Sequence, residues 1–264
     1  MYNFNYHRPS SLADAAKTLQ SAEEGKLVAG GMTLIPTLKQ RLAKPSDLID
    51  LAKIPDLKGI KKDGNTVVIG AMTKHAEVAS SDVVKGAIPA LAELASHIGD
   101  PAVRNRGTIG GSIANNDPAA DYPSAVVALN GTVITNKRKI AADDFFKGMF
   151  ETALEPGEIV TAVQFPVPEK AAYMKFPNPA SRYAIVGVFV AKTGSGVRVA
   201  VTGAGPSVFH QKDMEAALTK SFAPDAVANI KQSASGLNGD IHASPEYRAH
   251  LVTVMAKRAV AAAK

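Results

Sequence analysis

The chain has 264 residues, a formal net charge of +6, and neither cysteine nor tryptophan. Without cysteine it cannot carry disulfides, zinc–thiolate sites or iron–sulfur clusters, so any iron–sulfur centre in its chemistry must lie on another chain. No stretch approaches the ~20 consecutive apolar residues that cross a bilayer, and residues 1–10 lack a secretion-signal pattern. We therefore expect a cytoplasmic protein with no membrane span.

The positive charge does not indicate a nucleic-acid-binding protein. Lysines and arginines occur in small separate groups, at 58–62, 104–106 and 137–139, and no group is interleaved with aromatic side chains for base stacking. We interpret them as solvated surface. A mildly positive surface would also favour an anionic dinucleotide or an acidic partner subunit.

Residues 1–53 have the pattern of a small β-α-β unit. A serine-capped helix is predicted over 10–19, followed by a strand over 26–29. The next helix is predicted over 33–42, with Pro36 in its first turn, and the second strand over 48–51.

Residues 54–168 are expected to form a second α/β subdomain. A buried helix is predicted over 88–98, and Asn130-Gly131 predicts a hairpin turn between two strands. The predicted strands are 66–69, 126–129, 132–135 and 159–165.

A proline-containing linker near 166–171 predicts a domain boundary, so that 1–168 forms one domain and 169–264 a second. The second domain is expected to combine a small antiparallel sheet with helices, which makes the whole chain α+β. Its predicted strands are 184–191 and 196–202, and its predicted helices are 211–221, 224–236 and 246 to the end. In the last helix the expected inward stripe is Tyr247, Leu251, Val254 and Met255.

Two glycine doublets, Gly30-Gly31 and Gly110-Gly111, lie about eighty residues apart. Glycine permits φ > 0 and has no β-carbon to hold a phosphate away from the backbone N–H groups. Successive N–H groups can then form an anion-binding concavity. Either doublet alone is compatible with a simple tight turn, but the pair predicts a diphosphate held from two sides.

Polar side chains follow the second doublet. Asn115, Asn116, Asp117 and Asp121 could bind the sugar hydroxyls of a dinucleotide. Helix capping by Asp117 before Pro118 is the alternative, and both roles could hold together. By contrast, Gly203-Ala204-Gly205 lacks the rest of a dinucleotide fingerprint and is read as a turn.

Seven motifs occur in the order found in the FAD-binding subunit of molybdenum hydroxylases, which this chain therefore resembles. That family includes the medium subunit of aerobic carbon monoxide dehydrogenases and the flavin domain of xanthine dehydrogenases. The motifs are A-G-G-M-T-L-I-P (29–36), I-G-A-M-T-K-H (69–75), R-N-R-G-T-I-G-G-S (104–112), D-P-A-A-D-Y-P (117–123), A-Y-M-K-F (172–176), Y-A-I-V-G-V (183–188) and S-P-E-Y-R-A-H-L (244–251).

The resemblance implies an FAD-binding fold with two subdomains, about 1–53 and 54–168, and a carbon monoxide dehydrogenase flavoprotein-like C-terminal domain over 169–264. It also implies the FAD-binding residues, with no catalytic residue and no metal ligand on this chain. Those residues are Val28, Ala29, Gly30, Gly31, Met32, Thr33, Leu34, Thr73, Ala102, Gly107, Thr108, Gly110, Gly111, Ser112, Asn115, Asp121, Leu154 and Lys175.

Three of these positions carry further expectations from the resemblance. Asp121 matches a carboxylate near the ribityl chain, and Lys175 matches a lysine beside the isoalloxazine, although Lys175 could equally be a solvated strand residue. Tyr183 matches a mobile segment over the ring. The first loop has Met32 and Thr33 and no histidine for covalent attachment, so we expect the FAD to be non-covalent.

The function that the resemblance implies is electron transfer within a multi-subunit oxidoreductase. A large subunit with molybdopterin would oxidise the substrate, and [2Fe-2S] clusters on an iron–sulfur subunit would pass electrons to FAD on this chain, which would reduce an external acceptor. The complex is expected to be a dimer of heterotrimers. None of the six histidines has metal-ligand spacing, and no Ser–His–Asp or Cys–His arrangement is suggested.

Two alternatives stay open at this point. One is a self-sufficient FAD-dependent reductase that uses NAD(P)H, although the chain has no nicotinamide fingerprint. The other is a non-enzymatic nucleotide-binding scaffold.

Overall fold

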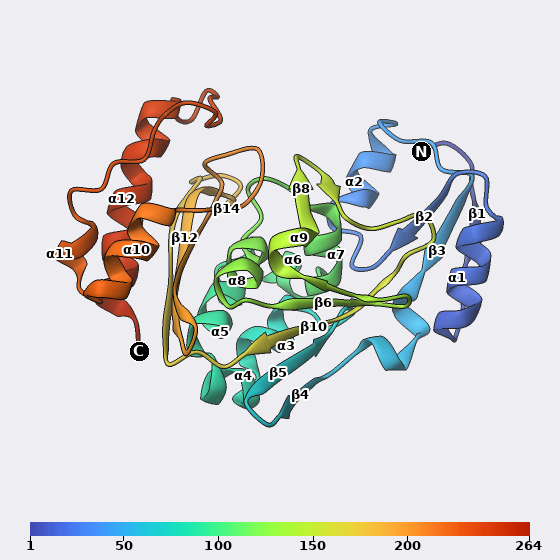
Figure 1. Cartoon of the computed structure of the whole chain (residues 1–264). Helices are drawn as coiled ribbons and strands as arrows, with labels where there is room; N and C mark the ends of the chain where they lie inside the picture. Colours follow the sequence, from blue (N-terminus) through green and yellow to red (C-terminus); the bar gives the residue numbers. More distant parts are fainter.

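The computed structural model describes residues 1–264, and its three main β-sheets lie in succession along the molecule (Figure 1). The N-terminal unit lies at one end and the C-terminal helices lie at the other, with a five-stranded sheet between them. None of the helices combines the length and apolar character that crossing a membrane requires. The expected α+β fold is confirmed.

The N-terminal unit is a parallel sheet of order β1-β3-β2, as the β-α-β pattern predicted. Ser11 caps the first helix by accepting a hydrogen bond from the backbone N–H of Asp14. Strand β1 was not predicted, because its three residues are too short and too polar to show a period. The elements are β1 (Asn5–His7), α1 (Leu12–Ser21), β2 (Gly25–Val28), α2 (Leu34–Lys39) and β3 (Asp47–Asp50).

The central subdomain is built on a sheet of order β4-β5-β10-β6-β7 in which all neighbours are antiparallel. Short helical turns η1 (Leu51–Lys53) and η2 (Pro55–Leu57) lead into it. The strands are β4 (Ile60–Asp63), β5 (Thr66–Gly70), β6 (Thr132–Thr135), β7 (Lys139–Ala141) and β10 (Val160–Pro166). The helices are α3 (His75–Ser80), α4 (Asp82–Ala87), α5 (Pro89–Ser96), α6 (Pro101–Arg104), α7 (Ile109–Asn115), α8 (Tyr122–Ala128) and α9 (Ala142–Phe145). A two-stranded hairpin, β8 (Phe146–Gly148) with β9 (Glu151–Thr152), follows α9.

Two predictions in this subdomain were wrong. The apolar run 126–129 falls at the end of helix α8 and is not a strand, and Asn130-Gly131 joins that helix to β6 instead of closing a hairpin. All seven residues of α8 are buried, so the run shows neither a helical nor a strand period. Asn130 still adopts the left-handed conformation that the turn prediction required, with φ of 52°.

The C-terminal region pairs an antiparallel sheet of order β11-β12-β13-β14 with three helices. Helix α12 begins at a Ser244 cap, as predicted, but Tyr247 of the expected inward stripe is 43% exposed. The helix predicted over 224–236 is confined to one turn. The elements are β11 (Lys170–Pro177), β12 (Ala184–Thr193), β13 (Gly196–Thr202), β14 (Phe209–His210), α10 (Lys212–Lys220), α11 (Pro224–Val227) and α12 (Pro245–Ala262).

Both faces of this last sheet are buried. One face places Tyr173 and Phe189 in the same apolar core as Leu91 of α5 and Val126 of α8. The other face packs against α10 to α12 through a separate core. The C-terminal sheet is thus a wall of the central subdomain, because successive residues of a strand point to opposite faces.

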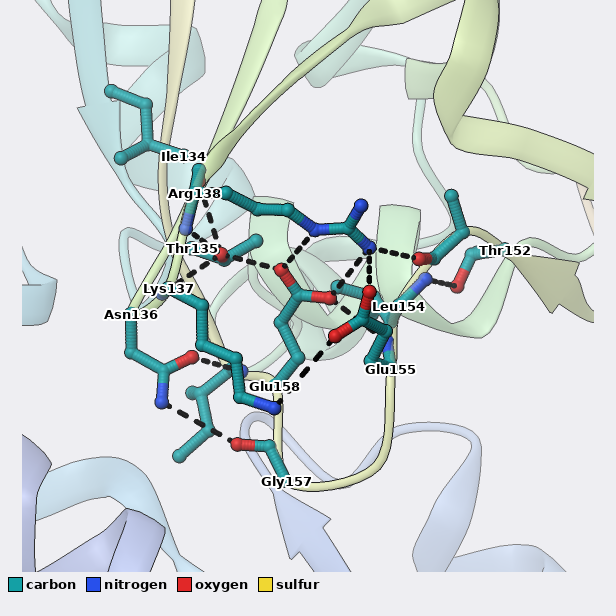
Figure 2. Close-up of polar contacts among 12 residues, drawn as sticks. Ile134, Thr135, Asn136, Lys137, Arg138, Thr152, Leu154, Glu155, Gly157 and Glu158 are labelled. Atoms are coloured by element: carbon teal, nitrogen blue, oxygen red, sulfur yellow. Dashed lines mark hydrogen bonds and ion pairs between the residues drawn. The ribbon is translucent and has the colours of Figure 1, made fainter.

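A buried carboxylate fixes the chain segment that leads into β10 (Figure 2). Glu158 accepts hydrogen bonds from Arg138 Nε at 3.0 Å, from the Thr135 hydroxyl at 2.7 Å and from the Glu155 backbone N–H at 2.8 Å. Asn136 exchanges two further hydrogen bonds with the backbone of Ile159. The hairpin between β6 and β7 therefore holds Ile159 and its neighbours in place.

Glu158→Gln is expected to lower the free energy of unfolding by about 2 kcal/mol at pH 7, because it removes charge-assisted hydrogen bonds from a buried group. The hydrogen bond from Arg138 is the main cause that holds the pKa of Glu158 at about 2 in the folded protein, against an ordinary 4.5. The contribution is therefore present above pH 4.5 and is lost as the pH falls toward 2. Urea denaturation at pH 7 and at pH 3 measures it.

Glu155→Gln is the matched control, since the Glu155 side chain is 57% exposed and pairs with Arg138 at the surface. We expect this control to change stability by less than about 0.5 kcal/mol. Equal losses in the two variants, or a Glu158→Gln deficit as large at pH 3 as at pH 7, would contradict the assignment.

Candidate functional site

A cavity of about 620 Å³ lies between the N-terminal unit and the central subdomain. The first glycine loop and helix α7 line it, together with the chain between β11 and β12. The two glycine doublets predicted to act together do meet here, although they are far apart in sequence.

The first loop presents free backbone donors to this cavity. None of the N–H groups of residues 30–34 donates a hydrogen bond within the chain. Gly31 has φ of 74°, and a β-carbon there would lie 2.8 Å from Ile35. A run of free N–H groups on a concave wall is suited to binding the oxygens of an anion.

The second loop differs from this expectation. The N–H groups of Ile109 and Gly110 donate to the carbonyls of Thr73 and Ala71, and that of Gly111 donates to the Thr108 hydroxyl. Gly110 and Gly111 lie in helix α7 and do not have positive φ. Gly110 is needed for packing, because a β-carbon there would lie 2.5 Å from that of Ala71.

What the second loop offers to a ligand is its side chains. Ser112 and Asn115 both line the cavity, and neither side chain forms a hydrogen bond within the chain. Thr108 is buried and caps α7. An anionic ligand would therefore meet backbone donors on one wall and hydroxyl and amide groups on the other.

Asp121 sits at the floor of the cavity and is 5% exposed. Its carboxylate accepts hydrogen bonds from Lys175 Nζ at 3.0 Å and from the Tyr173 hydroxyl. Burial raises the pKa of Asp121, and the Lys175 charge opposes that rise. The helix-capping alternative belongs to Asp117, whose carboxylate accepts from the backbone N–H of Ala119.

Lys175 is neither a solvated strand residue nor a lining residue of the cavity. Its side chain is 4% exposed and lies behind Asp121, where Nζ also donates to the carbonyl of His97 at 3.1 Å. It compensates the charge of Asp121, which would otherwise be costly to bury.

His75 also lines the cavity and packs against Tyr122, with the ring centroids 5.4 Å apart. Burial is the main cause that lowers its pKa to about 4, and the charge of Arg104 adds to the effect. The imidazole is therefore neutral at pH 7, and its buried Nδ1 has no hydrogen-bond partner.

Thirteen of the predicted FAD-binding positions line this cavity: Ala29, Gly30, Gly31, Met32, Thr33, Leu34, Gly107, Thr108, Gly110, Gly111, Ser112, Asn115 and Asp121. Five do not. Besides Lys175, these are Val28, which is buried beneath the first loop, and Thr73, whose hydroxyl bonds to the backbone of Gly59. Ala102 is on the exposed side of α6, and Leu154 packs against the central core.

Other lining residues had no signal in the sequence. Lys26 and Arg182 are the two lysine or arginine residues in the lining, and both would favour an anionic ligand. Ile159 and Val160 reach the cavity at the start of β10, where an apolar run indicates only a strand. Tyr183, expected from the resemblance to lie near the ring, is also in the lining. No group of three or more histidine or acidic residues is arranged to hold a metal ion.

Comparisons with known proteins agree with this arrangement. Residues 2–168 match the family model described as the FAD binding domain in molybdopterin dehydrogenase. Residues 171–263 match the one described as the CO dehydrogenase flavoprotein C-terminal domain.

Relatives match over nearly the full length. The chain is 37% identical to the carbon monoxide dehydrogenase medium chain of Hydrogenophaga pseudoflava, over 98% of this chain and 96% of that one. It is also 37% identical to the nicotine 6-hydroxylase medium subunit of Paenarthrobacter nicotinovorans, over 97% and 95%. A crystal structure of Cu,Mo-CO dehydrogenase in its cyanide-inactivated form superimposes with a TM-score of 0.92, at 33% identity, over 99% of this chain and 98% of that one.

Five free backbone donors, two unpaired polar side chains and two cations around one cavity fit a bound dinucleotide, and the matches cover both halves of the chain. The chain belongs to the family of FAD-binding medium subunits of molybdenum hydroxylases, which are flavoprotein oxidoreductases.

Proposed function

We propose that this chain relays electrons inside a molybdenum hydroxylase, from [2Fe-2S] clusters on an iron–sulfur subunit to an external acceptor, through non-covalently bound FAD. The observation that carries the proposal is the first glycine loop. Its free N–H groups at residues 30–34 face a cavity of a size suited to a dinucleotide.

The residues divide the work of holding the cofactor. The N–H groups of residues 30–34 bind the diphosphate, and Lys26 and Arg182 add positive charge at the rim. Ser112 and Asn115 hydrogen-bond to the sugar and ribityl hydroxyls from the opposite wall. FAD itself supplies the redox chemistry when bound.

Asp121 and Lys175 form a neutral pair beside this site. Asp121 faces the cavity, and Lys175 holds its carboxylate in place from behind. Because Thr73 accepts from Ile109 with its carbonyl, we assign Thr73 to positioning α7. Val28, Ala102 and Leu154 likewise support the walls.

We propose partners from the relatives' names. The matched proteins are medium chains or FAD subunits of carbon monoxide, nicotine and xanthine hydroxylases or dehydrogenases. The cysteine-free chain needs an iron–sulfur subunit and a molybdopterin-binding large subunit, and we expect a dimer of heterotrimers. This parentage favours the relay over a self-sufficient NAD(P)H reductase or a scaffold.

Two further assignments belong to the same proposal. We place the domain boundary at 168/169, between the end of β10 and the start of β11. We assign the protein to the cytoplasm, which fractionation of cells that express the complex will test.

The purified chain is expected to carry about one FAD that acid or heat releases. Gly111→Val should lower FAD affinity at least tenfold, because the added side chain enters the cavity from α7. At Gly111 a β-carbon would meet only the Thr108 hydroxyl at 3.1 Å and Ala29 at 3.4 Å, so the fold should tolerate the change. Flavin fluorescence titration of the apoprotein measures the affinity.

Gly86→Val is the matched control, since Gly86 is also helical and nothing lies within 4 Å of a β-carbon there. It imposes the same change in helix propensity without touching the cavity. Full FAD affinity in Gly111→Val would mean that α7 does not contact the cofactor, and an equal loss in both variants would mean a general folding defect.

The relay itself is tested by reduction of the flavin from the substrate side. In the reconstituted complex, the substrate of the molybdenum subunit should bleach the flavin absorbance near 450 nm, whereas the isolated chain should not respond. Substrate-driven bleaching of the isolated chain would show that it needs no partner and would overturn the relay. Rapid oxidation of NADH by the isolated chain would instead support the reductase alternative.

A further inference from the structure

A second cavity, of about 410 Å³, adjoins the first. The two share the side chains of Asp117, Ser181 and Tyr183, so one layer of residues separates them. The opposite walls of the second cavity come from the β8–β9 turn and from α12, whose starting end lies at the same edge of the molecule as β8 (Figure 1).

The β8–β9 turn holds two apolar side chains at this cavity in an exposed position. Met149 is 53% exposed and Phe150 is 57% exposed. Phe150 has φ of 57°, a conformation that a bulky residue rarely adopts. Backbone of this kind persists only where the surroundings impose it, and it is concentrated at functional sites.

Asn116 imposes that conformation. It is 1% exposed, its Nδ2 donates to the carbonyls of Gly148 and Glu151 at 2.8 Å each, and its own carbonyl accepts from the N–H of Phe150. Because Asn116 directly follows helix α7, the turn is tied to the wall of the first cavity. The fold thus fixes an exposed aromatic ring next to the cofactor cavity.

The charges of the second cavity disfavour an anion. Its ionisable lining groups are Asp117, Asp240, Arg248, His242 and Tyr183. Arg248 pairs with Asp240 at 2.6 Å and is thereby compensated. Asp117 has no cationic partner, and the diphosphate expected in the neighbouring cavity adds further negative charge.

We propose that this second cavity binds an aromatic compound that carries no negative charge and, resting on the function proposed above, that such a compound is the external oxidant. Phe150 and Tyr183 offer ring contacts, and the volume suits a bicyclic ring system. A p-quinone meets these conditions: its two carbonyl oxygens take up two electrons from the reduced cofactor and two protons from solvent to become hydroxyls. A nicotinamide dinucleotide would instead bring two phosphates toward Asp117.

Calorimetric titration of the oxidised flavoprotein with two naphthoquinones tests the site. Menadione is uncharged, and 1,4-naphthoquinone-2-sulfonate carries one negative charge on the same ring system. We expect menadione to bind at least tenfold more tightly. Phe150→Gly, which keeps φ > 0 accessible, should weaken menadione binding about tenfold.

Two further variants complete the design. Ile241→Ser is the control, because Ile241 is 96% exposed but does not line the cavity, and it should bind menadione as the wild type does. Asp117→Asn keeps the oxygen that accepts from Ala119 and should tighten binding of the sulfonate. Equal affinity for both quinones, or unchanged menadione binding in Phe150→Gly, would overturn the proposed site.

The oxidant role is tested separately, by mixing the chemically reduced flavoprotein with menadione without oxygen. The reoxidation rate should saturate at the concentration that the titration gives, and Phe150→Gly should shift it about tenfold. Binding without saturable reoxidation would leave a ligand site and overturn the oxidant assignment. A chain that binds no FAD would instead refute the function proposed above, while the menadione titration would still decide whether the cavity binds the quinone.

Discussion

The close approach of residue 30 to the backbone at residue 106 is the constraint on which the site depends. A β-carbon on Gly30 would lie 2.1 Å from the carbonyl oxygen of Arg106, so only glycine permits this packing. The contact brings the parallel N-terminal unit against the segment before α7. It leaves the next five N–H groups without partners inside the protein, facing a cavity instead. Unpaired backbone donors are costly to bury, and a bound anion is what removes that cost.

The second requirement is charge balance around the cavity. Asp121 is tolerated at 5% exposure because Lys175 and Tyr173 bind its carboxylate from the C-terminal sheet. That sheet can reach the site because both of its faces are buried, one of them against the central subdomain. The two family models meet near residue 170, yet the apolar core and this ion pair cross that point.

Much of the site could be predicted from sequence because it depends on residue types with few substitutes. Glycine at positions 30, 31 and 110 is required by close packing or by positive φ, and such positions leave a clear mark. The division of labour between the two loops could not be predicted. The sequence shows two similar doublets, but only tertiary pairing of Gly110 with Ala71 shows that the second loop's donors are already used. Tertiary burial also concealed helix α8, whose residues are apolar on every side.

Residues that act from behind the site were the hardest to place. Lys175 alternates like an ordinary strand residue, and its role follows from the fold of β11 against the central subdomain. Asn116 was expected to bind sugar hydroxyls, but its side chain holds the β8–β9 turn. In both cases the residue type was informative and the partner was not, because the partner lies far away in sequence.

The central claim is that the N–H groups of the first glycine loop hold the cofactor. Hydrogen–deuterium exchange of the chain with and without FAD measures this directly. The account predicts that FAD slows exchange strongly at residues 30–34 and only slightly at residues 109–111, whose amides are already bonded within the protein. Unchanged exchange at residues 30–34, with FAD bound and protection confined to α7, would contradict it.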